Sequence, residues 1–197
     1  MDMCGNGARC VARYAFDRDI APRSMVFDTP AGNVKADVLD DSNVSIGLSG
    51  VSAWERDIVI STPDGELCGQ WLNTGVPHAV FQVSDIDSFN VYDVGKSVRY
   101  ADHFQPGGTN ADFFERNDSG DLRIRTYERG VEGETLACGT GIAATALSAA
   151  DLGLAVSPVH LICQSGDRLT VTFDLDDLTD VVLTGPAKYV FEGIYTG

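Results

Sequence analysis

Two short segments share the pattern Cys-Gly-polar-Gly, and they carry the strongest chemical signal in the sequence. The first is Cys4-Gly5-Asn6-Gly7 and the second is Cys138-Gly139-Thr140-Gly141. Each leads into a run with helical spacing of apolar residues, so each cysteine stands at the predicted start of a helix. The unpaired N–H groups and the dipole of a helix start favour anions, and we expect them to lower the pKa of each thiol.

A pair of such cysteines indicates proton transfer at a stereocentre. Inversion requires removal of a proton from one face of a carbon and delivery of a proton to the other face. A thiolate and a thiol on opposite sides can do both. The glycines would let backbone amides approach a substrate carboxylate, and the two helix starts would stabilise its charge. The two motifs together therefore predict racemisation or epimerisation by two bases.

The other cysteines, Cys10, Cys68 and Cys163, are interpreted as packing residues. The five cysteines are an odd number, and none are spaced as Cys-x-x-Cys, which is evidence against a disulfide framework or a metal site. A redox or metal protein is the alternative that these cysteines leave open. If the two motif cysteines converge on one carbon, we expect that they can form an inactivating disulfide in the absence of substrate.

Two helices and many short strands would position the cysteines. Helical periodicity covers 4–17 and 137–151. The first motif follows no strand and the second follows many, which predicts that the first half has lost its opening strands. Strand-like runs bounded by turn residues occur at 25–27, 34–39, 44–48, 67–72, 78–83, 112–115, 122–128, 159–163, 169–173, 181–183 and 189–191.

Composition narrows the class of protein. The hydrophobic content of 44% is enough for a packed core, and no apolar run approaches the roughly 20 residues of a membrane span. The net charge of −15 would repel phosphate backbones, so no nucleic acid or membrane partner is expected. No signal peptide is visible, which predicts a cytoplasmic protein. A surface rich in Asp and poor in Lys is typical of proteins from a salty, halophilic cytoplasm.

The segments MCGNGARC and YERGVEGETLACGTGIAAT together resemble the diaminopimelate epimerase family. NTGVPHAV, RYADHFQPGGTNADFF and GPAKYVFEG follow the family in order, so the resemblance runs from the first catalytic cysteine to the end of the chain. It implies an α+β fold of two similar domains, each a mixed β-sheet wrapped around a central helix. The first domain would be incomplete, with 1–66 as its remainder and 187–197 as its return strand, and 67–186 would form the C-terminal domain.

The resemblance also implies an activity. It is the interconversion of LL- and meso-2,6-diaminopimelate, a step of lysine biosynthesis, by two-cysteine proton transfer. No cofactor and no metal would take part, the partner would be the small-molecule substrate, and a homodimer is possible. The alternatives are a proline or hydroxyproline racemase, a binding subunit without turnover, and an inactive truncated fragment of the epimerase. Proline racemases typically have histidine where Asn6 stands.

Residue roles follow from the same resemblance. Cys4 and Cys138 match the acid/base cysteines, and His78 matches a histidine that supports the first of them. The carboxylate at the reacting carbon would be held at Gly5, Asn6, Gly139 and Thr140. The distal end of the substrate would meet Asn110, Glu128 and Arg129, with the Arg129 fork on the distal carboxylate.

These positions also have plainer interpretations. His78 could merely begin a strand, Asn110 could supply a turn, and Glu128 with Arg129 could form a surface ion pair. Val76 stands where many family members have a substrate-contacting asparagine before the Pro-His pair. The N-terminal strands of the family, with their asparagines, have no counterpart in this sequence.

Overall fold

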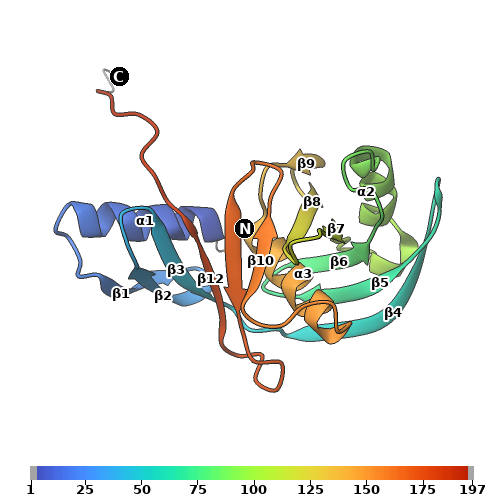
Figure 1. Cartoon of the computed structure of the whole chain (residues 1–197), viewed down its shortest axis with the longest axis horizontal. Helices are drawn as coiled ribbons and strands as arrows, with labels where there is room; N and C mark the ends of the chain where they lie inside the picture. The colour runs from blue at the N-terminus through green and yellow to red at the C-terminus, as the bar shows by residue number, and fades with distance from the viewer. Residues whose placement is uncertain (1–3, 195–197) are drawn as a thin grey trace.

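The computed structural model describes residues 4–194 and has an α+β architecture in which a curved sheet encloses one helix (Figure 1). The enclosed helix is α3 (Gly139–Asp151), and ten of its thirteen residues are buried. A helix that is apolar on all sides is stable only inside a core. Strands of both flanks of the sheet, from β5 to β8 and from β10 to β12, contact α3.

The strands of residues 4–194 form one continuous sheet in the order β1-β2-β3-β12-β11-β10-β8-β7-β6-β5-β4, with β9 paired to β8 off this path. Two neighbouring pairs, β6 with β7 and β8 with β10, are parallel. Their crossovers contain α2 (Val91–Arg99) and α3, as parallel pairing requires. The strands are β1 (Ser24–Thr29), β2 (Gly32–Val38), β3 (Asn43–Leu48), β4 (Ala53–Thr62), β5 (Gly65–Asn73), β6 (Pro77–Gln82), β7 (Asn110–Arg116), β8 (Leu122–Glu128), β9 (Gly133–Thr135), β10 (Val159–Ile162), β11 (Arg168–Thr172) and β12 (Val181–Pro186).

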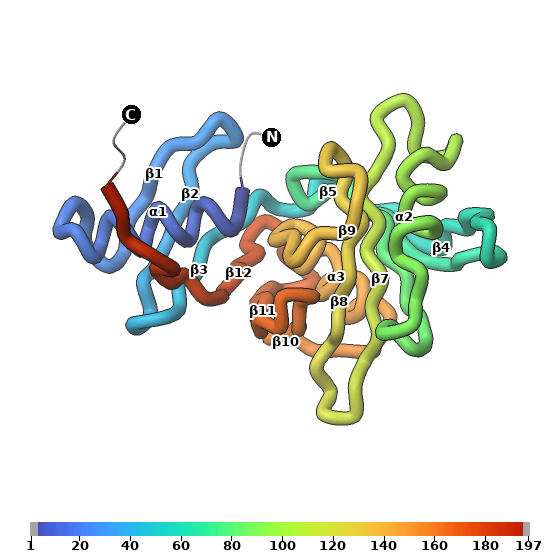
Figure 2. The backbone as a smooth tube through the Cα atoms, turned by 90° about the horizontal axis from the view of Figure 1, so that it is seen from above, coloured from blue at the N-terminus to red at the C-terminus, as the bar shows by residue number. Residues whose placement is uncertain are grey.

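Helix α1 (Gly5–Asp17) lies outside this enclosure and packs on β2 and β3 (Figure 2). Its small buried residues, Ala8 and Ala12, face the sheet. Val11 and Tyr14, on the other face, are 53% and 50% exposed. The predicted helices at 4–17 and 137–151 are therefore both confirmed, but they lie in different surroundings.

Strands β3 and β12 join the two parts of the sheet. They pair antiparallel over six residues, from Asn43 opposite Pro186 to Leu48 opposite Val181. Strand β4 belongs to the expected first domain, 1–66, yet it pairs with β5 at the opposite edge of the sheet. In space, β1–β3 with α1 form one part, and β4–β12 with α2 and α3 form the other.

Two strands, one α-helix and the short 3-10 helix Asp102–Phe104 were missed in the sequence. Strand β4 has a mostly exposed, charged face, which hides its alternation. Strand β9 has three residues, which is too short for a pattern. Helix α2 contains Gly95, a residue that lowers helix propensity. The ring of Tyr127 lies against Gly95, where any Cβ would overlap it, so the glycine serves close packing.

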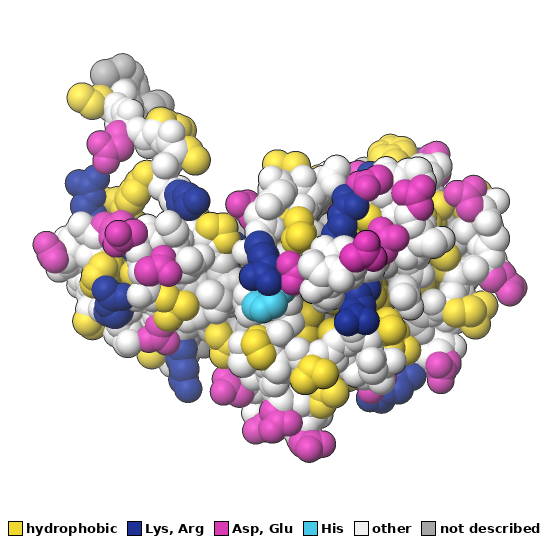
Figure 3. Space-filling view, in the orientation of Figure 1, with side chains coloured by type: hydrophobic (Ala, Val, Ile, Leu, Met, Phe, Trp, Pro, Cys, Tyr) yellow, Lys and Arg dark blue, Asp and Glu magenta, His cyan; other side chains and the backbone are white. Residues whose placement is uncertain are grey.

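The predicted strand at 189–191 does not form, and residues 187–194 have no regular secondary structure. Ala187 is still buried, and the residues after it leave the body as an arm, visible in Figures 1 and 3, with Val190 and Phe191 89% and 82% exposed. A strand requires a neighbour that accepts its hydrogen bonds, and among the described residues only Ala187 of this segment donates a backbone hydrogen bond, to the Ser42 carbonyl at 2.8 Å. The return strand expected at 187–197 is therefore absent over 187–194, and 195–197 lie outside the described residues.

The surface agrees with the acidic composition. On the face shown in Figure 3, Asp and Glu side chains are scattered and are mixed with a smaller number of Arg and Lys. In the part of the chain that the structure describes, no helix is long and apolar enough to cross a membrane.

Candidate active site

A cavity of about 400 Å³ lies where the starts of α1 and α3 meet. It collects nine of the ten residues expected at the site, and the tenth, His78, lies beneath it. The cavity is lined by Cys4, Gly5, Asn6, Val76, Asn110, Glu128, Arg129, Gly130, Val131, Ala137, Cys138, Gly139 and Thr140.

The two cysteines have the same local geometry. Each is the residue just before its helix, with extended backbone at φ −125° for Cys4 and −120° for Cys138. The glycines that follow them touch: a Cβ on Gly139 would lie 3.6 Å from the Cα of Gly5. The two helix starts are therefore in direct contact, and the motifs place both sets of free N–H groups at one cavity.

The two thiols differ in burial. Cys4 is exposed, whereas Cys138 is partly buried. Burial raises the pKa of Cys138 to about 12, and the negative charges of Asp112 and Glu128 add to this effect. Hydrogen bonding with Thr140 and with the Gly141 N–H opposes the rise but does not cancel it. The prediction that the helix start lowers the pKa is therefore wrong for Cys138, because loss of solvent outweighs the dipole.

Arg9 ties the start of α1 to the rest of the site. Its guanidinium is buried and donates to Asn6 Oδ1 at 2.9 Å and to the Pro186 carbonyl at 3.3 Å. Asn6 in turn donates from Nδ2 to the Ala137 carbonyl at 3.5 Å, just before Cys138. Burial lowers the pKa of Arg9 below its ordinary value. Asn6 is thereby held between the two motifs.

Glu128 and Arg129 enter the cavity at the end of β8. Asn110 clamps this point: its Oδ1 accepts from the Arg129 N–H at 2.8 Å, and its Nδ2 donates to the Pro77 carbonyl at 2.8 Å. The Arg129 side chain donates to the Gly107 carbonyl at 3.2 Å. Asn110 thus lines the cavity and also holds three chain segments together.

The turn after Arg129 is held by Glu132. This residue has a positive φ of 57°, and its carboxylate accepts from the Gly130 N–H at 3.0 Å and from Arg99 Nε at 3.2 Å. The Tyr100 hydroxyl donates to its other oxygen at 3.0 Å. Burial opposes ionisation of Glu132, but these partners keep its pKa below the ordinary value. The turn is therefore fixed to the end of α2.

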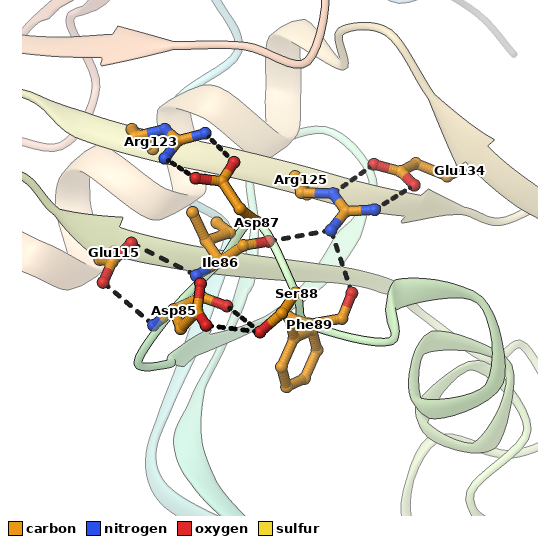
Figure 4. Close-up of polar contacts among 9 residues, drawn as sticks. All are labelled: Asp85, Ile86, Asp87, Ser88, Phe89, Glu115, Arg123, Arg125 and Glu134. Atoms are coloured by element: carbon orange, nitrogen blue, oxygen red, sulfur yellow. Dashed lines mark hydrogen bonds and ion pairs between the residues drawn. The ribbon is translucent and has the colours of Figure 1, made fainter.

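Strands β8 and β9 form an antiparallel hairpin that contains this turn, and a second set of hydrogen bonds holds the hairpin in place (Figure 4). Arg125, on β8, pairs with Glu134 of β9 through two hydrogen bonds of 2.7 Å. Its remaining nitrogen donates to the carbonyls of Ile86 and Phe89, at 2.9 and 3.0 Å, in the loop before α2. A planar fork that uses all three nitrogens fixes its partners in one geometry. Glu128 and Arg129 thus project from a rigid hairpin.

His78 lies at the start of β6 and is fully buried. It was expected beside the first cysteine, but the hydrogen bonds that the structure gives its ring are on the side of the second. Nδ1 is 2.6 Å from Asp112 Oδ2, and Nε2 is 2.9 Å from Thr140 Oγ1. Thr140 Oγ1 is 3.6 Å from Cys138 Sγ. His78 therefore reaches Cys138 through the hydroxyl of Thr140.

The sequence analysis missed Asp112, which is fully buried in β7. A signal was present, because this carboxylate interrupts the apolar run Ala111–Phe114 of a central strand. Buried carboxylates are rare unless they are paired.

Among the remaining cysteines, Cys163 is buried as expected, but Cys10 and Cys68 are exposed, so the packing interpretation is wrong for those two. Among residues 4–194 no cluster of His, Cys, Asp or Glu side chains is arranged to hold a metal ion.

The fold is shared with racemases and related isomerases of known structure. A probable proline racemase from Agrobacterium radiobacter superposes with a TM-score of 0.72 at 17% identity, covering 100% of this chain and 68% of its own. A hydroxyproline epimerase from Agrobacterium vitis gives 0.72 at 20% identity, over 94% of this chain and 64% of its own. At these identities the likeness shows the fold alone.

Sequence comparison is more specific. The family model for diaminopimelate epimerase matches residues 70–190. A diaminopimelate epimerase from Hydrogenobaculum is 46% identical over 196 residues, which are 98% of this chain and 70% of that protein. The enzyme from Aquifex aeolicus is 43% identical over 195 residues, 98% of this chain and 69% of that protein. These identities do not favour the proline racemase alternative, and they show that the chain belongs to the diaminopimelate epimerase family.

Proposed function

We propose that this chain epimerises diaminopimelate at an α-carbon held between Cys4 and Cys138. The observation that carries the proposal is the meeting of two Cys-Gly helix starts at one cavity, with Gly5 and Gly139 in contact. Two thiols that face a common cavity from different elements can address opposite faces of one carbon. The chemistry needs no cofactor, because proton removal and delivery are both assigned to thiols.

The state of Cys138 determines which proton transfer it can begin. The raised pKa of Cys138, about 12, keeps this residue as a thiol, ready to donate. In the direction in which Cys138 is the acid, Cys4 acts as the thiolate base. It takes the α-proton and forms an S–H bond as the C–H bond breaks. Cys138 then gives its proton to the opposite face and becomes the thiolate. In the reverse direction the two roles are exchanged.

The charges of the cavity match a substrate with an ammonium and a carboxylate at each end. The free N–H groups of the two helix starts would hold the carboxylate at the reacting carbon and stabilise the charge that develops there. Glu128 and Arg129, on the clamped hairpin, would bind the distal ammonium and the distal carboxylate, respectively. One negative and one positive group side by side favour diaminopimelate over proline, which has no second charged end.

Hydrogen exchange tests the proposal. The chain is incubated with LL-diaminopimelate in D₂O, and deuterium is followed in substrate and product during the first few per cent of conversion. Two bases predict that the meso product carries solvent deuterium at the inverted centre while recovered substrate stays unlabelled. Label entering recovered substrate as fast as product would indicate one base. Absence of reaction with both stereoisomers would overturn the assigned activity.

A further inference from the structure

A continuous row of hydrogen-bonded side chains runs from Cys138 into the core. It passes from Cys138 Sγ to Thr140 Oγ1, then to His78, then to Asp112 at the distances given above. It ends at Thr126, whose hydroxyl donates to Asp112 Oδ1 at 2.7 Å. Four elements contribute: the start of α3, β6, β7 and β8. A row that begins at a cavity thiol and is buried thereafter has the layout of a proton relay.

The direction of the hydrogens follows from the partners. An ionised Asp112 can only accept, so the Thr126 hydroxyl donates to one oxygen and His78 Nδ1–H donates to the other. In a neutral imidazole Nε2 is then unprotonated and accepts from the Thr140 hydroxyl. Thr140 Oγ1 has thereby used its hydrogen and presents lone pairs to the Cys138 thiol. Asp112 thus determines which atom donates and which accepts in every hydrogen bond of the row.

The packing around the pair indicates that its geometry is strictly held. His78 and Asp112 are both fully buried, and Thr126 is 3% exposed. Helix α3 passes directly over them at Gly141: a Cβ there would lie 2.5 Å from Asp112 Oδ1 and 3.1 Å from His78 Cε1. Any side chain at this position would displace the carboxylate. The second glycine of the motif is therefore needed by the buried pair beneath the helix.

We propose that Asp112 is a positioning residue that fixes the His78 tautomer, so that Thr140 and His78 can take the proton of Cys138. In the transfer the Cys138 S–H bond breaks and an O–H bond forms on Thr140. The original Thr140 hydrogen moves to His78 Nε2. The products are a Cys138 thiolate and a His78 imidazolium that the Asp112 carboxylate neutralises. The proposal rests on the assignment of Cys138 as an acid/base group, and the relay serves the direction in which Cys138 is the base.

The direct effect of the Asp112 charge on thiolate formation at Cys138 is opposite in sign to its effect through the relay, which makes the relay testable. Asp112 and Glu128 are the acidic groups that face Cys138, and their charges disfavour its thiolate. If Asp112 acted on Cys138 only through its charge, then Asp112→Asn would promote thiolate formation. If Asp112 acts through His78, the same change removes the partner of the imidazolium and can reverse the tautomer, so thiolate formation becomes harder.

The experiment measures the alkylation rate of Cys138 by iodoacetamide near pH 8, in the full chain with Cys4→Ala to avoid cross-reaction. Peptide mass spectrometry quantifies the modification, and the exposed thiol of Cys68 in the same chain is the internal reference. Because only thiolate reacts, we expect Asp112→Asn to slow Cys138 about tenfold or more, equivalent to at least one pKa unit. An unchanged or faster rate overturns the proposal. No turnover is required, so loss of the assigned activity and loss of the relay are separate outcomes.

Two further variants exclude a packing effect. Thr126→Val removes the other hydrogen bond of the same carboxylate and should slow Cys138 much less; an equal fall would overturn the proposal. Thr140→Val interrupts the row at a partly exposed position and should slow Cys138 as Asp112→Asn does. Combining Thr140→Val with Asp112→Asn should add little, whereas additive losses would show independent effects and overturn the relay.

The histidine tautomer can also be read directly. The chain has three histidines, His78, His103 and His160, so ¹⁵N-labelled imidazole signals can be assigned by substitution. Nitrogen–proton correlation spectra should show neutral His78 protonated at Nδ1. In Asp112→Asn the proton should move wholly or partly to Nε2. A His78 protonated at Nε2 in the unaltered chain would contradict the proposed polarity.

Discussion

Helices α1 and α3 begin with the same motif and have the same length, but only α3 is enclosed. Five of the thirteen residues of α1 are buried, against ten of thirteen in α3. Helix α1 rests on β2 and β3, whereas α3 is surrounded by seven strands. The local sequence therefore determines the helix start and the cysteine position, and the surrounding sheet determines what each thiol experiences.

The consequence is a chemical asymmetry within a symmetric motif. Cys4 is exposed, while burial and two acidic neighbours raise the pKa of Cys138 to about 12. The charged groups that line the cavity, Glu128 and Arg129, also belong to the part that contains α3. The α1 part contributes Cys4, Gly5 and Asn6. One part thus supplies a thiol and backbone groups, and the other supplies a thiol together with the charges that select a substrate.

The largest expected effect is that of removing either thiol. Cys4→Ala and Cys138→Ala should each lower epimerisation by roughly 10³-fold or more, since each face of the carbon needs its own group. Despite their different burial, the two losses should be similar. Cys10→Ala, an exposed position in α1, is the matched control and should leave the rate unchanged. Near-normal turnover in either motif variant would break the two-base assignment.

The difference in enclosure should appear in stability. Leu147→Ala in α3 removes a fully buried side chain, so we expect a loss of about 2–5 kcal/mol in the free energy of unfolding. Val11→Ala in α1 truncates a side chain that is 53% exposed, and its effect should stay within roughly 0.5 kcal/mol. Urea unfolding at constant pH measures both. Similar losses would show that α1 is packed as tightly as α3.

The smallest effect concerns the division of substrate contacts. Arg129→Lys keeps the charge but loses the fork, so the KM for diaminopimelate should rise about tenfold while kcat changes less. Arg116→Lys, an exposed position on the neighbouring strand β7, is the control. Steady-state kinetics over a range of substrate concentrations separate the two constants. An unchanged KM would assign Arg129 to the structure of the hairpin, through its bond to Gly107.

Much of the framework was readable from spacing. Both helices and most strands follow from periodicity and turn residues, because these patterns report which faces are buried. Strand β4 was missed since its exposed charges hide the alternation, and the strand at 189–191 was wrongly predicted. Residues 189–191, Tyr-Val-Phe, have high β-propensity, but pairing depends on a neighbour, and local propensity carries no information about neighbours.

The sequence by itself determined that two Cys-Gly motifs begin two helices and that the chain resembles one family. Those properties are local, or they follow from matching residues in order. Only the tertiary structure decided that Gly5 meets Gly139, that Cys138 is partly buried beside two acidic groups, and that His78 joins Thr140 to Asp112. Solvent exclusion and hydrogen-bond partners depend on segments that are far apart in the chain. His78, for example, is 34 residues from Asp112 and 62 residues from Thr140. The pKa of a thiol reflects that three-dimensional environment, so the cysteine motif alone could not predict it.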